Sequence, residues 1–209
     1  MSKPTFISGW GTRREQFPML ASSTRFITPF TETSPEDVEQ LLKSEQGNIL
    51  VGWSTGAHMI LKVLDQIVSQ YEHIFLAAPF LSFGDSLPAR ITQGMIRDMD
   101  VDPQKMVDGF HANCGESAIP SFDPKEIPEL TQGLQFLLDS NVSPDTLSGE
   151  YSNVTVIHGK QDRIVRAKAV KKLMPLLNGA TLVSIESGHK IDENSLAQII
   201  HEATDTDLF

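Results

Sequence analysis

Short apolar runs alternate with helical stretches along most of this chain. The runs are three to five residues long and rich in β-branched side chains, which is typical of buried strands. They cover residues 5–7, 25–28, 48–51, 73–77, 154–157 and 181–185. Because apolar strands separated by helices need cover on both faces, the pattern predicts a mostly parallel six-stranded sheet in an α/β fold.

Three helices can be placed between or after these strands. Ser34 is followed by a proline and two acidic residues, the order found where serine caps a helix and acids complement its positive end. Two more helical stretches cover residues 166–177 and 194–203. The helices therefore follow the strands in the alternation that a doubly covered sheet requires.

Residues 82–152, here called the lid, break this alternation with three amphipathic helix candidates and no convincing strand. Their apolar side chains recur at helical spacing. The three stripes are Ile91, Met95 and Met99; Met106, Phe110 and Cys114; and Ile127, Leu130, Leu134 and Leu137. We therefore expect a single domain over residues 1–209, with the lid inserted between the fourth and fifth strands and lying over the strand ends.

Length and composition place the chain in a broad class. A chain of 209 residues can bury most of its apolar surface in one domain without disulfides. The single cysteine, Cys114, has no partner within the chain, which fits a reducing compartment. The first residues lack the apolar core of a signal peptide, and no apolar stretch approaches the length of a membrane span. We expect a soluble cytoplasmic protein without a membrane partner.

Charge narrows the range of partners. The formal net charge is −10, which argues against nucleic acid, because phosphate binding needs clustered lysines and arginines. The acidity is concentrated in residues 84–150, which hold twelve acidic and four basic residues. No histidines, cysteines or carboxylates stand at convincing metal-site spacing, and no glycine-rich loop suits a phosphate. We therefore expect neither a metal nor a cofactor.

The segment Gly52-Trp-Ser-Thr-Gly56 is the strongest chemical signal in the chain. It places a serine between two glycines where an apolar strand turns into an apolar helix. In such a turn the serine adopts a strained backbone conformation that exposes its hydroxyl, and a side chain at either glycine would clash. This pattern predicts that Ser54 is a nucleophile.

A serine hydroxyl needs a general base, and the base needs a group that orients it. His189 follows the sixth predicted strand and Asp162 follows the fifth. Both lie at carboxyl ends of parallel strands, the edge at which open α/β sheets place their sites. Asp85, after the fourth strand, and Asp192, near His189, are alternatives for the orienting acid.

The oxyanion of an acyl-transfer intermediate needs hydrogen-bond donors. The backbone N–H of Thr55, directly after the serine, is one candidate, and that of Trp10 in the glycine-flanked turn after the first strand is the other. Apolar side chains expected near the serine would line a site for a carbon chain. The predicted substrate-binding residues are Trp10, Trp53, Phe80, Leu81, Phe83 and Met95.

Taken together, four segments resemble the α/β-hydrolases, and more narrowly the pimeloyl-acyl-carrier-protein methyl ester esterases of biotin synthesis. These segments are Gly9-Trp-Gly11, Gly52 to Gly56, His158-Gly-Lys-Gln-Asp-Arg-Ile-Val165, and the stretch of the lid from Met95 to Gly115. The chain order serine, aspartate, histidine is also that of α/β-hydrolases.

The resemblance implies a serine carboxylesterase with Ser54 as nucleophile, Asp162 as orienting acid and His189 as base. It further implies an oxyanion hole formed by Trp10 and Thr55, a small acyl ester as substrate, and an acyl-carrier protein as a partner. Relatives bind their acidic carrier through basic lid residues, whereas Asp98, Asp100 and Asp102 here would oppose an acidic partner. Two alternatives are a hydrolase of free small esters or thioesters, and an inactive hydrolase fold that serves as a binding protein.

Overall fold

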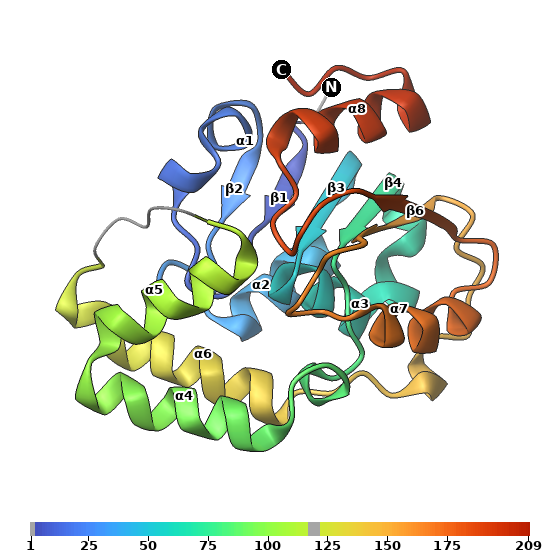
Figure 1. Cartoon of the computed structure of the whole chain (residues 1–209). Helices are drawn as coiled ribbons and strands as arrows, with labels where there is room; N and C mark the ends of the chain where they lie inside the picture. The colour runs from blue at the N-terminus through green and yellow to red at the C-terminus, as the bar shows by residue number, and fades with distance from the viewer. Residues whose placement is uncertain (1–2, 117–121) are drawn as a thin grey trace.

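The computed structural model describes residues 3–116 and 122–209. Its centre is a six-stranded sheet in the order β2-β1-β3-β4-β5-β6, and every neighbouring pair of strands is parallel. Figure 1 shows the strands running side by side between two layers of helices. The strands are β1 (Thr5–Ile7), β2 (Arg25–Ile27), β3 (Gly47–Trp53), β4 (Tyr71–Ala77), β5 (Val154–Gly159) and β6 (Thr181–Ile185).

The predicted α/β class and the six strands are confirmed, and the sheet is parallel throughout rather than mostly so. The apolar runs located each strand, but they predicted β3, β4 and β5 to be shorter than they are in the structure. β3 and β4 each have seven residues, because polar or small residues at their ends still pair with a neighbouring strand. Pairing along the sheet, which the apolar pattern does not record, therefore sets the true strand ends.

Two helical layers cover the sheet (Figure 1): α1 and α8 lie on one side, and α2, α3 and α7 on the other. The bounds are α1 (Pro18–Ser23), α2 (Pro35–Ser44), α3 (Thr55–Ile67), α7 (Ala167–Leu173) and α8 (Glu193–Thr204). Ser34 caps α2 by accepting a hydrogen bond from the Asp37 N–H, as expected. The helix predicted over 166–177 ends early and continues as a 3₁₀ turn, because Pro175 has no N–H for the α-helical bond.

The lid contains α4 (Ala89–Val101), α5 (Pro103–Cys114) and α6 (Ile127–Asp139). Figure 1 shows them as a separate group of helices to one side of the sheet. Asp102 caps α5 through the Lys105 N–H, and Pro103 opens it, so α4 and α5 are separated by a single residue. The indole N–H of Trp10, in the loop after β1, donates to the Leu130 carbonyl of α6 at 2.8 Å. The lid is thereby joined to the carboxyl edge of the sheet.

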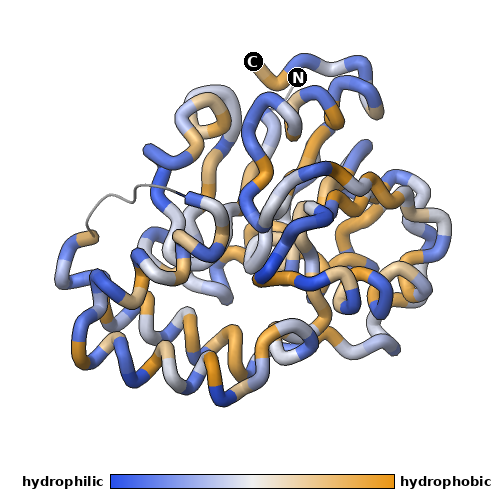
Figure 2. Tube along the Cα trace, viewed as in Figure 1, coloured by the Kyte–Doolittle hydropathy of each residue, from blue (hydrophilic) through white to orange (hydrophobic). Residues whose placement is uncertain are grey.

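Hydrophobic residues concentrate in the central strands, whereas hydrophobic and hydrophilic residues alternate along α4 (Figure 2). Five of the ten residues in the predicted lid stripes are buried, among them Met99, Cys114 and Leu134, and four more are half-buried. Ile91 is the exception, with 43 % of its surface exposed. Within the described residues, no helix combines the length and the hydrophobicity needed to cross a membrane.

Two close backbone approaches fix α3 against the sheet. A Cβ atom on Gly56 would lie 2.1 Å from the Ile7 carbonyl oxygen of β1. A Cβ on Gly52 would lie 2.8 Å from the backbone N of Ala57. Both distances are far below van der Waals contact, so the two glycines are required for the helix to begin this close to the strands.

We expect Gly56→Ala to lower the free energy of unfolding by about 3 kcal/mol, because the added methyl overlaps a backbone carbonyl that cannot rotate away. Urea unfolding followed by circular dichroism measures the change. Gly109→Ala is the matched control, because a Cβ there meets nothing within 4 Å and a helix interior favours alanine. Equal stability of the two variants would contradict this account of the packing.

Candidate active site

Ser54 occupies the turn between β3 and α3 with φ 56° and ψ −113°, in a region that non-glycine residues rarely adopt. Two backbone bonds fix this conformation. The Ser54 N–H donates to the Ala77 carbonyl of β4 at 2.8 Å, and the Ser54 carbonyl accepts from the His58 N–H at 3.0 Å. The hydroxyl is therefore held at a fixed position at the carboxyl edge of the sheet.

The structure brings His189 and Asp162 to this hydroxyl. His189 Nε2 lies 2.9 Å from Ser54 Oγ, and His189 Nδ1 lies 2.8 Å from Asp162 Oδ2. The other carboxylate oxygen of Asp162 accepts the N–H groups of Ile164 and Val165, both at 2.8 Å. All three side chains are buried. The carboxylate is thus oriented by its own loop before it contacts the histidine.

The loops that carry these residues approach one another closely. A Cβ on Gly159, at the end of β5, would lie 2.1 Å from the Gly188 carbonyl oxygen. The Trp53 indole N–H donates to the His189 carbonyl at 3.0 Å. Gly159 and the indole of Trp53, the residue before Ser54, therefore fix the path of the loop that carries His189.

The two alternative acids bond elsewhere. Asp85 forms an ion pair with Lys172 at 2.9 Å. Asp192 caps α8 by accepting from the Ser195 N–H and hydroxyl, and these hydrogen bonds lower its pKa. Of the three candidates, only Asp162 contacts His189 in the structure.

The two residues expected to supply the oxyanion donors contact each other. The Trp10 N–H donates a hydrogen bond to the Thr55 side-chain hydroxyl at 3.3 Å. The Thr55 N–H belongs to the first turn of α3, where N–H groups have no acceptor within the helix. A Cβ on Gly9 would lie 3.2 Å from the Ser54 Cβ, so the loop after β1 packs directly against the serine.

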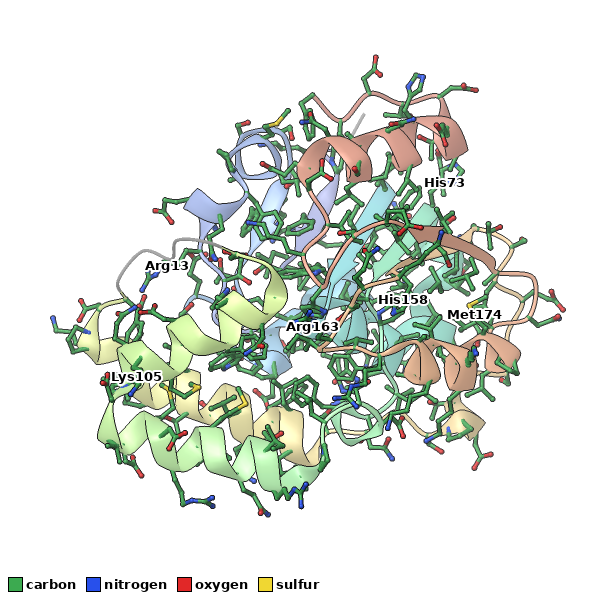
Figure 3. All side chains as sticks on the ribbon, in the orientation of Figure 1. Arg13, His73, Lys105, His158, Arg163 and Met174 are labelled. Atoms are coloured by element: carbon green, nitrogen blue, oxygen red, sulfur yellow. The ribbon has the colours of Figure 1, made fainter. Side chains whose placement is uncertain are left out.

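A large groove lies between the lid and the loop after β5. It has a volume of about 980 Å³ and includes Asp162 in its lining. Its apolar wall is formed by Leu87, Ile91, Met95, Val101, Met106, Phe110 and Ile164. Charged side chains line it as well, namely Asp98, Asp102, Lys105, Arg163 and Arg166. Figure 3 shows Arg163 near the centre of the molecule and Lys105 out on the lid.

Of the six predicted substrate-binding residues, the structure places only Met95 in this groove. Trp10 and Trp53 are buried and use their indoles to hold Leu130 and His189. Phe80, Leu81 and Phe83 are buried in the core at the start of the lid. The five core residues stand at or after the carboxyl ends of β1, β3 and β4, where these large side chains are used for packing.

Two further histidines, His58 and His158, have structural partners. His58, one turn after Ser54, bonds the Phe80 carbonyl at 2.9 Å and the Ser140 hydroxyl at 2.8 Å. Its ring stacks on Phe80, and burial lowers its pKa to about 4. His158 bonds the Val165 carbonyl at 2.9 Å. Burial also raises the pKa of the Cys114 thiol, which keeps this cysteine protonated.

Sequence reasoning missed a buried polar cluster at the end of α5, consisting of His111, Glu116, Gln16 and Lys190. These residues come from three separate segments, and only tertiary contacts bring them together. The one local signal was His111, a polar residue adjoining the apolar stripe of α5. Among the residues that the structure describes, no three histidine, cysteine or carboxylate side chains are placed to hold a metal ion.

The fold is shared with known hydrolases. An esterase from Exiguobacterium antarcticum matches with a TM-score of 0.69 and 18% identity, over 98% of this chain and 91% of that one. An α/β-hydrolase enzyme from a Medee basin deep-sea metagenome library has a TM-score of 0.69 and 12% identity, over 98% and 89%. An acetylester hydrolase from Corynebacterium glutamicum has a TM-score of 0.65 and 15% identity, over 98% and 85%.

No protein-family model matches the sequence, and a comparison with curated proteins finds no match. The structural likeness therefore establishes the fold. This chain has a minimal α/β-hydrolase fold.

We expect stability to fall between pH 6.5 and 4 because of His58, whose pKa is lowered in the folded state. The unfolded chain then binds a proton that the folded chain does not, which costs about 3 kcal/mol at pH 4. Urea unfolding at several pH values measures this loss. His58→Gln should flatten the slope in this window, whereas exposed His201→Gln should not. An unchanged slope in His58→Gln would rule out His58 as its origin.

Proposed function

We propose that this chain, with its α/β-hydrolase fold, is a serine carboxylesterase. The observation that carries the proposal is the continuous hydrogen-bonded chain from Ser54 Oγ through the His189 ring to the Asp162 carboxylate. Burial protects this chain from water, and the strained turn at Ser54 holds the hydroxyl at its end. A nucleophile, a base and an orienting acid are the groups that ester hydrolysis needs.

The contacts of His189 determine which ring nitrogen carries the hydrogen in its neutral form. A carboxylate can only accept, so His189 Nδ1 carries the hydrogen and donates it to Asp162. His189 Nε2 is then free to accept the Ser54 hydroxyl hydrogen. When Ser54 Oγ attacks an ester carbonyl, its proton passes to Nε2, and Asp162 stabilises the imidazolium that forms.

The remaining steps follow from the same atoms. The tetrahedral intermediate places its oxyanion near the backbone N–H groups of Trp10 and Thr55. Its collapse breaks the bond to the alcohol oxygen, which takes the proton from His189 Nε2 and leaves an acyl-Ser54 ester. Water then attacks this ester with His189 as base, which releases the carboxylic acid and regenerates the serine.

The groove beside Asp162 is our candidate for the binding site of the acyl chain. Its apolar wall suits a hydrocarbon, and its volume of about 980 Å³ lies in the range of small-molecule sites. The structural neighbours described as an esterase and an acetylester hydrolase support ester hydrolysis as the reaction class.

For the narrower substrate, a pimeloyl-carrier methyl ester, the charge of the lid is the relevant feature. Asp98, Asp100 and Asp102 are exposed at the end of α4 or directly after it. They would repel an acidic carrier within a Debye length of about 8 Å. We therefore favour a free short- to medium-chain ester or thioester over a carrier-bound one.

We expect wild-type protein to hydrolyse p-nitrophenyl esters with acyl chains between two and ten carbons, and Ser54→Ala to lose at least about 10⁴-fold in kcat. The loss follows because no other hydroxyl contacts His189 Nε2 in the described structure. Ser22→Ala, at an exposed serine, is the matched control. An ester hydrolase that keeps its rate in Ser54→Ala would refute the assignment, and a chain that hydrolyses no ester and reacts with no phosphonate probe would be a binding protein.

Asp162→Asn should lower kcat by about 10⁴-fold, because an amide no longer fixes the histidine tautomer or stabilises the imidazolium. Asp192→Asn should leave kcat unchanged and affect stability only slightly, because asparagine caps helices about as well as aspartate. Steady-state kinetics and urea unfolding of both variants separate the two roles. Equal losses of kcat would argue against Asp162 as the acid.

A further inference from the structure

The end of α5 is bonded to both loops that carry the proposed catalytic machinery. His111 Nε2 donates to the Gly11 carbonyl at 3.0 Å, and Gly11 directly follows Trp10. The Cys114 carbonyl accepts the Lys190 N–H at 3.0 Å, and Lys190 directly follows His189. The end of α5 therefore holds two residues. Gly11 follows the proposed oxyanion donor Trp10, and Lys190 follows the proposed base His189.

An ion pair between a buried carboxylate and a partly exposed lysine joins these two attachments. The Glu116 carboxylate is 3 % exposed and lies 3.2 Å from Lys190 Nζ and 3.8 Å from His111 Nδ1. It also accepts a hydrogen bond from the Gln16 side-chain amide. The backbone carbonyl of Gln16 accepts from Lys190 Nζ at 3.0 Å. The Lys190 ammonium lies over the Phe17 ring, 4.7 Å from its centre. Both charges are thus held by fixed partners.

The surroundings of Glu116 keep it ionised. Burial by itself would raise its pKa, but the nearby His111 ring, the hydrogen bond from Gln16 and the charge of Lys190 together outweigh burial and lower it. Removing one member of a buried pair leaves the other charge uncompensated, which is far more costly than losing an exposed pair. Loss of either charge would therefore leave the other without its partner next to both loops.

We propose that Glu116 and Lys190 are positioning residues. Through the end of α5 they hold the loop that carries His189 and the loop after β1, which carries Trp10, in fixed positions relative to each other. This inference rests on the proposed esterase function for its kinetic consequence, and on the structure alone for its effect on His189. The His189 ring contacts the Ser54 hydroxyl, the Asp162 carboxylate and the Trp53 indole. The ion pair adjoins it through Lys190, the next residue in the chain. Loss of either charge should weaken the contacts between the end of α5 and the two loops. It should also change the electrostatic potential at the His189 imidazole.

The two substitutions should shift the His189 titration in opposite directions. Glu116→Gln removes a negative charge and leaves Lys190, which destabilises the imidazolium, so the measured midpoint should move to lower pH. Lys190→Met removes the positive charge and leaves Glu116, so the midpoint should move to higher pH. The double variant should return close to the wild-type midpoint.

Imidazole ¹H–¹⁵N NMR of histidine-labelled protein measures these midpoints without any substrate. The His189 signal is identified by its absence in His189→Gln. With p-nitrophenyl esters, both single variants should lose about tenfold in plateau kcat with KM unchanged, because misplaced groups act mainly in the transition state. The acid limb of kcat/KM should move in the same direction as the NMR midpoint.

Glu186→Gln is the matched control, since Glu186 lies three residues before His189 but forms an exposed pair with Lys160. It should change neither the midpoint nor kcat, because exposed pairs are screened.

Thermal unfolding shows which variants are folded at the temperature of the titration. Opposite shifts of the His189 midpoint support the proposal, and any other pattern overturns it, including shifts in one direction. Opposite shifts in a chain that hydrolyses no ester would retain the positioning role and reject the esterase.

Discussion

The backbone conformation of Ser54 is the constraint on which the rest of the site depends. A non-glycine residue at positive φ costs of order 1–3 kcal/mol, so it persists only where neighbouring contacts fix it. Bonds to Ala77 and His58 supply these contacts, and the absence of a side chain at Gly56 lets α3 begin against β1. The same packing that strains the serine also aims its hydroxyl at the place where the other loops meet.

The remaining groups of the site are oriented before any substrate arrives. Asp162 is held by two backbone N–H groups of its own loop, and His189 is held by Asp162 and by the indole of Trp53. Preorganised groups of this kind need little rearrangement during a reaction, which is the main source of electrostatic catalysis. The lid adds a second layer of support, because the end of α5 bonds the loops after β1 and β6.

This arrangement gives the large aromatic residues near the serine a structural role. Trp10 and Trp53 each donate an indole N–H to a backbone carbonyl, one in the lid and one in the histidine loop. The groove instead takes its apolar wall mainly from α4, α5 and the residue after Asp162. Packing next to Ser54 is thus separated from the groove, and the acidic lid residues Asp98 and Asp102 line the groove.

The α/β class, the six strands and the helical character of the lid could be predicted from the sequence, because apolar periodicity follows burial within each element. The sequence also singled out Ser54, Asp162 and His189, because glycine spacing and position after a strand are local features. The three-dimensional fold was needed to show that Asp162 rather than Asp85 or Asp192 contacts His189. It also decided that five of the six expected pocket residues are core, and that Glu116 meets Lys190. These contacts depend on which loops lie close together in the folded chain. Contacts between distant segments produce no periodic pattern in the sequence.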